Sequence, residues 1–197
     1  MHASPELLAS IERLYVVFST YPLPKYTDPC LCCHTTEDEA RVHHRPLRQL
    51  EPDDLQQFAY DAILTWGGER VLKHFLPRPF ELFITIPNPS LHLADPEILF
   101  SKFRHGKWYE WPESEQDAVR NFFHCLWNDV LNYESRYDGD VWETESCLCS
   151  IAQSEDDLTP YFDQWIKNDS LEACLTLSGL LLQSAVALSK NHGRDAF

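Results

Sequence analysis

Glycine and basic residues are scarce in this chain, and each scarcity excludes a class of function. Only 6 of the 197 residues are glycine, and neither a phosphate-cradling loop nor a Gly-x-Ser-x-Gly motif occurs. Lys and Arg number 16 against 31 Asp and Glu, which gives a net charge of −15. Because attraction to phosphate needs a basic surface, we expect no nucleic-acid partner and no binding to anionic membranes. No motif identifies catalytic residues, so the sequence leaves open whether the chain is an enzyme.

Long apolar runs are also missing. The longest candidate, residues 171–188, is interrupted by Glu172, Ser178, Gln183 and Ser184, whereas a membrane-spanning helix needs about 18–20 apolar residues. No basic stretch precedes an apolar one at the start of the chain, so we expect no signal peptide and a cytoplasmic location. The 7 cysteines are an odd number, and in that compartment we expect reduced thiols unless they hold a metal.

Signals for helix starts recur along the chain. Proline suits the first helical position because its missing N–H would have no partner there. Prolines with an acidic or hydroxyl residue close by stand at Pro5, Pro52, Pro96, Pro112 and Pro160. Thr36 with Glu39 forms a capping-box pattern, and Ser170 precedes a further helical stretch.

Apolar residues at spacings of three and four follow these starts, which is the pattern of helices with one buried side. After the second of these prolines the pattern continues to Trp66, and we expect Gly67-Gly68 to end that helix. The last helix carries its apolar stripe from Cys174 to Leu188.

The fold prediction follows from these patterns. No stretch of comparable length alternates with a period of two, and residues 83–86 are the best strand candidate. We predict an all-α fold with one domain that spans residues 1–197. It is expected to be a bundle of about seven to nine helices, with a loop rich in cysteine and proline at residues 20–34.

The segment Cys30-Leu31-Cys32-Cys33-His34 is the cluster with metal-ligand chemistry. Cys30 and Cys33 have the two-residue gap that lets two thiolates hold one tetrahedral zinc ion. The candidate ligands are Cys30, Cys33, His34 and His74, with His43 and His44 as alternatives. No second pair follows, because Cys147 and Cys149 fall in an expected helix and point to different faces. A redox role lacks the usual βαβ context. The cofactor prediction is therefore zinc or none, and the alternative is that these thiols pack as small apolar groups.

Acidic residues are concentrated between Glu134 and Glu172. This stretch contains eleven Asp and Glu residues, and its basic residues are Arg136 and Lys167. Such a surface speeds encounter with a basic protein partner, although it also serves solubility alone. We predict a protein-binding module, in its most specific form an immunity protein that neutralises a basic bacterial toxin by charge-steered occlusion. The alternative is a structural or catalytic zinc protein. The candidate partner-binding residues are Asp138, Asp140, Glu143, Glu145, Asp156 and Asp157, with Tyr137 and Trp142 as buried anchors.

Several short motifs follow one another between Cys30 and Leu82. The Cys-x-x-Cys loop and a short acidic helix are followed by Pro-Leu-Arg-x-Leu at 46–50, Thr-Trp-Gly at 65–67 and His-Phe-Leu-Pro-Arg at 74–78. This order resembles a family of uncharacterised bacterial proteins, as does the later stretch from Trp111 to Trp127. The family often has His between its two cysteines, where this chain has Cys32 and so keeps a ligand. No activity is established for the family, so the resemblance implies a fold more than a function.

Overall fold

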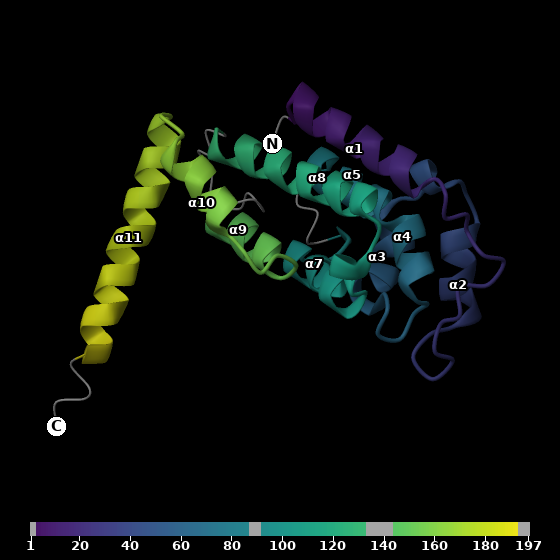
Figure 1. Ribbon diagram of the computed structural model, residues 1–197. Coiled ribbons are helices and arrows are strands. Elements are labelled where there is room, and N and C mark those ends of the chain that lie inside the picture. The colour runs from purple at the N-terminus through teal and green to yellow at the C-terminus, as the bar shows by residue number, and fades with distance from the viewer. Residues whose placement is uncertain (1–2, 87–91, 133–143, 193–197) are drawn as a thin grey trace.

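The computed structural model describes residues 3–86, 92–132 and 144–192. Within these ranges the regular elements are helices, so the all-α prediction is confirmed (Figure 1). The helices are, in chain order, α1 (Pro5–Phe18), α2 (Thr36–His43), η1 (Leu47–Gln49), α3 (Pro52–Asp61), α4 (Glu69–Phe75), α5 (Pro77–Thr85), α7 (Pro96–His105), η2 (Trp108–Glu110), α8 (Glu113–Leu131), α9 (Thr144–Ala152), α10 (Thr159–Ile166) and α11 (Leu171–His192).

The predicted helix starts agree with the structure to within one residue. Ser4 caps α1 because its hydroxyl accepts a hydrogen bond from the Leu7 amide at 3.1 Å. The capping box of α2 is formed by Thr35 and Asp38, and not by Thr36 and Glu39 as predicted. The Asp38 carboxylate accepts from the Thr35 amide at 2.9 Å, which leaves the Glu39 side chain free to face the cysteine loop.

Residues 83–86 do not form the predicted strand. Helix α5 continues through this stretch to Thr85. The reason is burial: Phe80, Phe83 and Ile84 lie three and four positions apart and are all buried in the core. The period of the helix therefore overrides the local strand preference of aromatic and β-branched residues.

Helix α3 ends at Asp61 and not at Gly67 as predicted. The Asp61 carbonyl oxygen accepts hydrogen bonds from the amides of Leu64, Thr65 and Trp66, at 3.0 to 3.1 Å. This tight turn forces Ile63 into the left-handed region, with φ of 69°. As a result, Thr65 and Trp66 leave the helix and lie beside the cysteine loop.

Helix α8 forms the centre of the core. It packs against α1 on one side and against α9 and α10 on the other (Figure 1). Phe122, Phe123 and Trp127 of α8 are fully buried. Phe80 of α5 stacks on Phe122 with ring centroids 4.5 Å apart, so the aromatic residues serve the core and not a ligand pocket.

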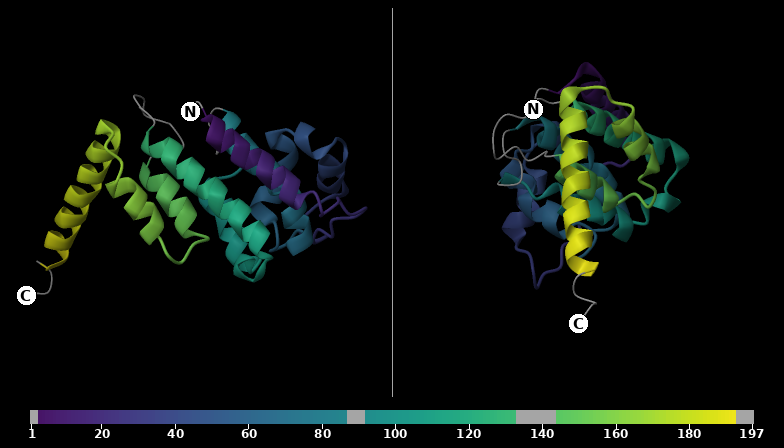
Figure 2. Two further views of the ribbon diagram at one scale, coloured as in Figure 1. Left: turned by 45° about the horizontal axis from the view of Figure 1, so that its top comes forward. Right: turned by 90° about the vertical axis from the view of Figure 1, so that its left-hand side faces the viewer.

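Helix α11 extends away from the rest of the molecule (Figure 2). Its first turn is attached, since Ala173 is buried and its carbonyl accepts from the Trp165 indole at 3.0 Å. Leu181 and Leu182 are more than 60% exposed. Among the side chains that the structure describes in this helix, Leu177 and Leu180 are partly buried against the core. Among the described residues, no helix has the length and apolar character needed to cross a membrane.

Candidate metal centre

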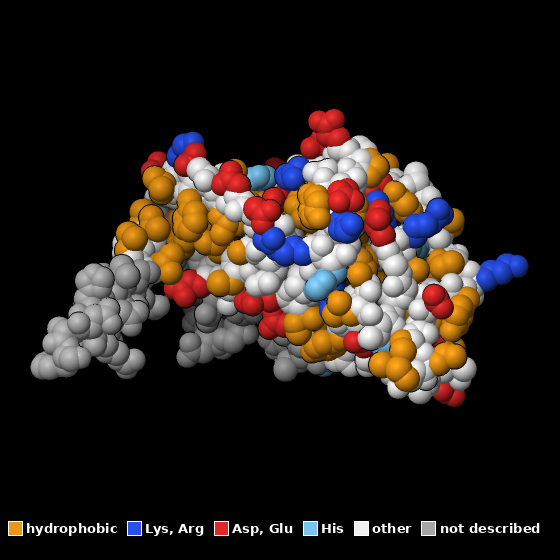
Figure 3. Space-filling model, turned by 60° about the horizontal axis from the view of Figure 1, so that its bottom comes forward, with side chains coloured by type: hydrophobic (Ala, Val, Ile, Leu, Met, Phe, Trp, Pro, Cys, Tyr) orange, Lys and Arg blue, Asp and Glu red, His pale blue; other side chains and the backbone are white. Residues whose placement is uncertain are grey.

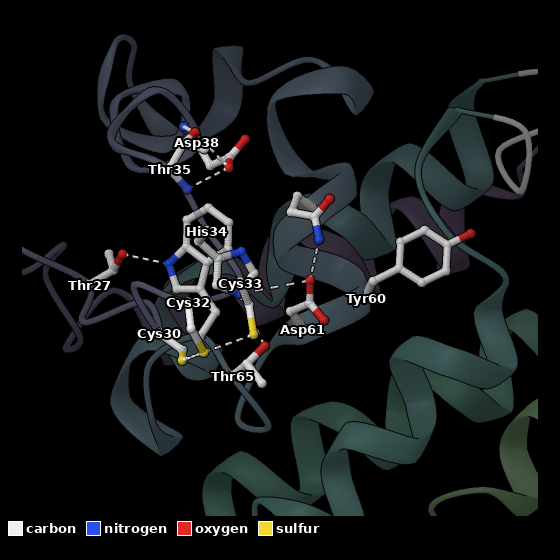
Figure 4. A network of polar contacts seen from close by, with 12 residues as sticks. Thr27, Cys30, Cys32, Cys33, His34, Thr35, Asp38, Tyr60, Asp61 and Thr65 are labelled. Carbon is white, nitrogen blue, oxygen red and sulfur yellow. Dashed lines mark hydrogen bonds and ion pairs between the residues drawn. The ribbon is translucent and has the colours of Figure 1, made fainter.

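Three thiols meet at the tip of the cysteine loop. The Sγ atoms of Cys30 and Cys32 are 2.8 Å apart, and those of Cys32 and Cys33 are 3.5 Å apart. All three sulfurs lie within 4.8 Å of one another, and all three thiols are free. A tight turn brings them together, because the amides of Cys33 and His34 both donate to the Cys30 carbonyl, at 2.9 and 3.0 Å. Figure 4 shows the sulfur atoms gathered on one side of this turn.

The connection between α3 and α4 holds the turn at Cys30 in place. The Cys30 amide donates to the Thr65 carbonyl at 2.7 Å, and the Trp66 indole donates to the Thr27 hydroxyl at 2.6 Å. Gly67 completes this contact with φ of 64°, and a Cβ there would lie 2.9 Å from the Thr27 carbonyl oxygen. Glycine is therefore required at this position.

Glu39 of α2 holds the same part of the loop from a second direction. Its carboxylate accepts from both the amide and the hydroxyl of Thr27. It also lies 2.9 Å from Nε2 of His43. His44, the other alternative ligand, lies 3.6 Å from the Asp54 carboxylate. Both histidines are thus engaged with carboxylates.

His34 is only 5% exposed and lies under the thiols without joining their group. Its ring packs on Trp66 with centroids 4.8 Å apart. Its Nε2 atom lies 3.0 Å from the Thr65 hydroxyl and 3.9 Å from the Asp61 carboxylate. Within the described residues, its Nδ1 atom is buried with no hydrogen-bond partner.

His74 lies on α4, at the other end of the loop. Its Nδ1 atom is 2.7 Å from the Tyr21 carbonyl oxygen, so this histidine anchors the start of the loop three residues after α1. Burial lowers the pKa of the His74 imidazole, and His43 lowers it further. The structure therefore brings together Cys30 and Cys33, and places His34 and His74 outside the three-sulfur group.

The prediction did not include Cys32 among the ligands, although its sulfur is the nearest neighbour of Cys30. Contact with the Cys32 thiol lowers the pKa of Cys30, and the same contact raises the pKa of Cys32 to about 11. A thiol that donates to its neighbour stabilises the thiolate that a metal or an oxidant needs. The sequence signal that could have identified this ligand was the presence of Cys32 between Cys30 and Cys33.

The three sulfurs fit a zinc ion with a small adjustment. With Zn–S bonds of 2.3 Å, sulfurs at two corners of a tetrahedron lie about 3.8 Å apart. The Cys32–Cys33 distance of 3.5 Å is close to this value, and the 2.8 Å between Cys30 and Cys32 must widen by about 1 Å. Cys32 and Cys33 are exposed, so their side chains have room for this movement.

The predicted partner-binding residues are only partly described. Asp138, Asp140, Glu143, Tyr137 and Trp142 lie outside the described residues. Glu145 is exposed in the first turn of α9. The Asp156 carboxylate lies 2.7 Å from Arg104, and Asp157 accepts from the Thr159 amide at 2.9 Å to start α10.

Basic residues accompany the acidic ones on the described surface. Besides the Asp156–Arg104 pair, Glu155 lies 3.2 Å from Arg120. Figure 3 shows acidic and basic side chains next to one another on the face that it draws. This part of the acidic stretch is therefore partly neutralised by arginines from α7 and α8.

Residues from the motifs between Cys30 and Leu82 also take part in contacts between helices. Arg78 donates to the Leu50 carbonyl at 2.8 Å and lies 2.7 Å from Glu81, which accepts from the Tyr15 hydroxyl at 2.6 Å. The guanidinium of Arg48 lies 3.6 Å from the centre of the Tyr15 ring. These contacts join α1, α5 and the segment at 46–50, so the motifs have a structural role.

No protein-family model, curated protein or solved structure matches the chain. The resemblance to a bacterial family therefore remains a prediction from its motifs, and the geometry of the site carries the functional argument.

Proposed function

We propose that the protein binds a thiophilic metal ion, zinc in the first instance, through Cys30, Cys32 and Cys33. The observation that carries this proposal is the group of three sulfurs within 4.8 Å of one another on a single turn. Thiolates are the ligands that select zinc over hard cations such as magnesium and calcium. The proposal is that of a zinc-binding helical protein, and it leaves the choice between a structural and a catalytic zinc open.

Zinc analysis of the purified chain tests the proposal. The protein should be purified without a polyhistidine tag, and its zinc content measured by elemental analysis. We expect close to one equivalent of zinc per chain. A content of less than about a tenth of an equivalent, together with no zinc uptake by the reduced apoprotein, would exclude the site.

Single substitutions then identify the ligands. Cys32→Ser and Cys33→Ser should each weaken zinc binding at least about tenfold in competition with a chromophoric chelator. Cys149→Ser is the matched control, because this thiol is also exposed but lies on α9. Equal zinc affinity in all three variants would contradict the assignment.

Binding of a basic protein is a second candidate function, and the net charge of −15 favours it. An immunity protein for a basic toxin is its most specific form. Of the candidate partner-binding residues that the structure describes, Glu145, Asp156 and Asp157 are exposed. A pull-down from the native host provides the partner, and charge reversal of Asp138, Asp140, Glu143 and Glu145 then tests the mechanism. Unchanged affinity and unchanged salt dependence would refute steering by charge.

A further inference from the structure

We propose that Cys30 and Cys32 form a reversible disulfide, and that its formation releases the metal from the site. The first half stands on the thiol geometry alone. The second half rests on the proposed metal-binding function, because it requires that these two sulfurs be ligands.

The distance between the two sulfurs supports a bond between them. They are 2.8 Å apart, which is longer than the disulfide bond length of about 2.05 Å and shorter than the contact distance of unbonded sulfurs that do not interact. A small rotation of one exposed side chain closes the gap. Cys33 is farther from Cys32, at 3.5 Å, and a bond between neighbours in sequence would strain the backbone.

The backbone between Cys30 and Cys32 is also suited to a disulfide. The hydrogen bonds from Cys33 and His34 to the Cys30 carbonyl close a single turn that is not continued as a helix. This turn brings the two sulfurs to 2.8 Å, so the two side chains already point toward one another, as a disulfide requires. The bond therefore needs only a small adjustment of the side chains.

Cys147 and Cys149 provide an internal comparison, since they have the same spacing. Both lie in α9, where residues two apart face different directions. Cys147 is fully buried and Cys149 is exposed, so their sulfurs do not converge. The comparison shows that spacing alone does not make a reactive pair. The turn that begins at Cys30 is what brings the Cys30 and Cys32 sulfurs together.

The oxidation is balanced with a peroxide as the oxidant. One thiolate of the pair attacks a peroxide oxygen, so that an S–O bond forms, the O–O bond breaks and hydroxide leaves to become water. The sulfur is oxidised to a sulfenic acid. The neighbouring sulfur then attacks this sulfur, the S–O bond breaks, and the second hydroxide leaves with the proton of the attacking thiol as water. Two thiols and one peroxide thus give one disulfide and two waters.

The consequence for the metal follows from ligand chemistry. Thiolate sulfur binds zinc, and the proposed metal site has three cysteine sulfurs to offer. A Cys30–Cys32 disulfide removes two of them and leaves Cys33. A single exposed thiolate does not retain zinc against a chelator, so oxidation should empty the site and reduction should restore it.

The experiment uses the full chain, as apoprotein and loaded with zinc. Each sample is treated with hydrogen peroxide and analysed by intact mass, and a second portion is then alkylated and analysed by peptide mapping. We expect the apoprotein to lose about 2 Da, with Cys33 still alkylated and with full reversal by dithiothreitol. Cys33→Ser should keep the disulfide, and Cys30→Ser and Cys32→Ser should lack it. A bond to Cys33, a bond between chains, or oxidation no faster than that of Cys149 would overturn the assignment.

Zinc release is followed in the loaded sample with a chromophoric chelator. Oxidation should release the bound zinc in step with disulfide formation, and lower the zinc affinity by at least about tenfold. If zinc binds but remains bound after the disulfide forms, the proposed switch is wrong and the metal-binding function stands. If the disulfide forms but the reduced protein never binds zinc, the metal-binding function fails and the thiol pair stands.

Discussion

A buried ion pair joins α4 to α8 next to the start of the cysteine loop. The Lys73 ammonium lies 2.8 Å from the Glu115 carboxylate and 2.6 Å from Glu69, and its side chain is 2% exposed. Tyr21 donates to the other Glu115 oxygen at 2.5 Å. Removing one partner of a buried pair leaves the other charge uncompensated, which costs about 3–5 kcal/mol.

The two single substitutions should differ because the partners have different support. After Lys73→Met, Glu115 keeps only the Tyr21 hydroxyl, so the free energy of unfolding should fall by about 3 kcal/mol. After Glu115→Gln, Lys73 keeps Glu69, which is half exposed, and the loss should be smaller, about 2 kcal/mol. The double variant should lose less than the sum of the two, with a coupling energy of about 1–3 kcal/mol.

Urea denaturation followed by far-ultraviolet circular dichroism measures these values. Lys167→Met is the control, because Lys167 is 77% exposed and lies 3.9 Å from Asp163. Its effect should stay below about 0.5 kcal/mol. Additive losses in the double variant, or single losses no larger than that of the control, would refute the view that the pair acts as one buried unit.

Three further predictions concern the core, the loop and the pH dependence. Phe80→Ala should lower the free energy of unfolding by about 3–5 kcal/mol, and Tyr109→Ala, at a side chain that is 61% exposed, by less than about 0.5 kcal/mol; urea denaturation measures both. Trp66→Phe removes the N–H that donates to Thr27, so stability should fall by about 1 kcal/mol and calorimetric titration should show weaker zinc binding. Because burial lowers the pKa of His74 below that of the unfolded chain, the unfolded state binds more protons, and stability should fall as the pH drops through about 6.5. His74→Gln should flatten this slope in denaturation curves measured from pH 5 to 8, and an unchanged slope would exclude His74 as its source.

The helix pattern could be predicted from the sequence because its signals are local. Proline at a first helical position and an acid or hydroxyl before it need no information from elsewhere in the chain. Cys147 and Cys149 show the same principle, since helical spacing alone predicted that they would point to different faces, and Cys147 is buried while Cys149 is exposed.

The errors arose where distant contacts decide the structure. Residues 83–86 read as a strand because burial against the aromatic core is not visible in their own sequence. The end of α3 depends on the contact of Trp66 with Thr27, 39 positions away, which draws Trp66 out of the helix. Isoleucine rarely adopts the left-handed conformation, so Ile63 gave no sign in the sequence that a turn requires this conformation there.

The candidate site was predicted only in part, because contacts between residues far apart in the sequence also position its side chains. The spacing of Cys30 and Cys33 identified the loop, but the sequence gives no measure of how the Cys32 sulfur lies. His34 and His74 have ligand chemistry, and their roles depend on Thr65 and the Tyr21 carbonyl, which only the fold places beside them.

The acidic stretch shows the limit of counting charges. Net charge is a sum along the chain, whereas neutralisation depends on neighbours in space. Arg104 lies 2.7 Å from Asp156 and Arg120 lies 3.2 Å from Glu155. Such pairs on the described surface reduce the field that a partner would meet.

The attachment of the cysteine turn to the α3–α4 connection has a consequence for the apoprotein. Thr65, Trp66 and Gly67 hold the turn with contacts that involve no sulfur atom. The conformational entropy of the turn is therefore lost when the helices fold, and an arriving ion finds the three sulfurs already close to one another. In small zinc domains the metal drives folding. Here a chelator should strip the ion and leave the helical body intact.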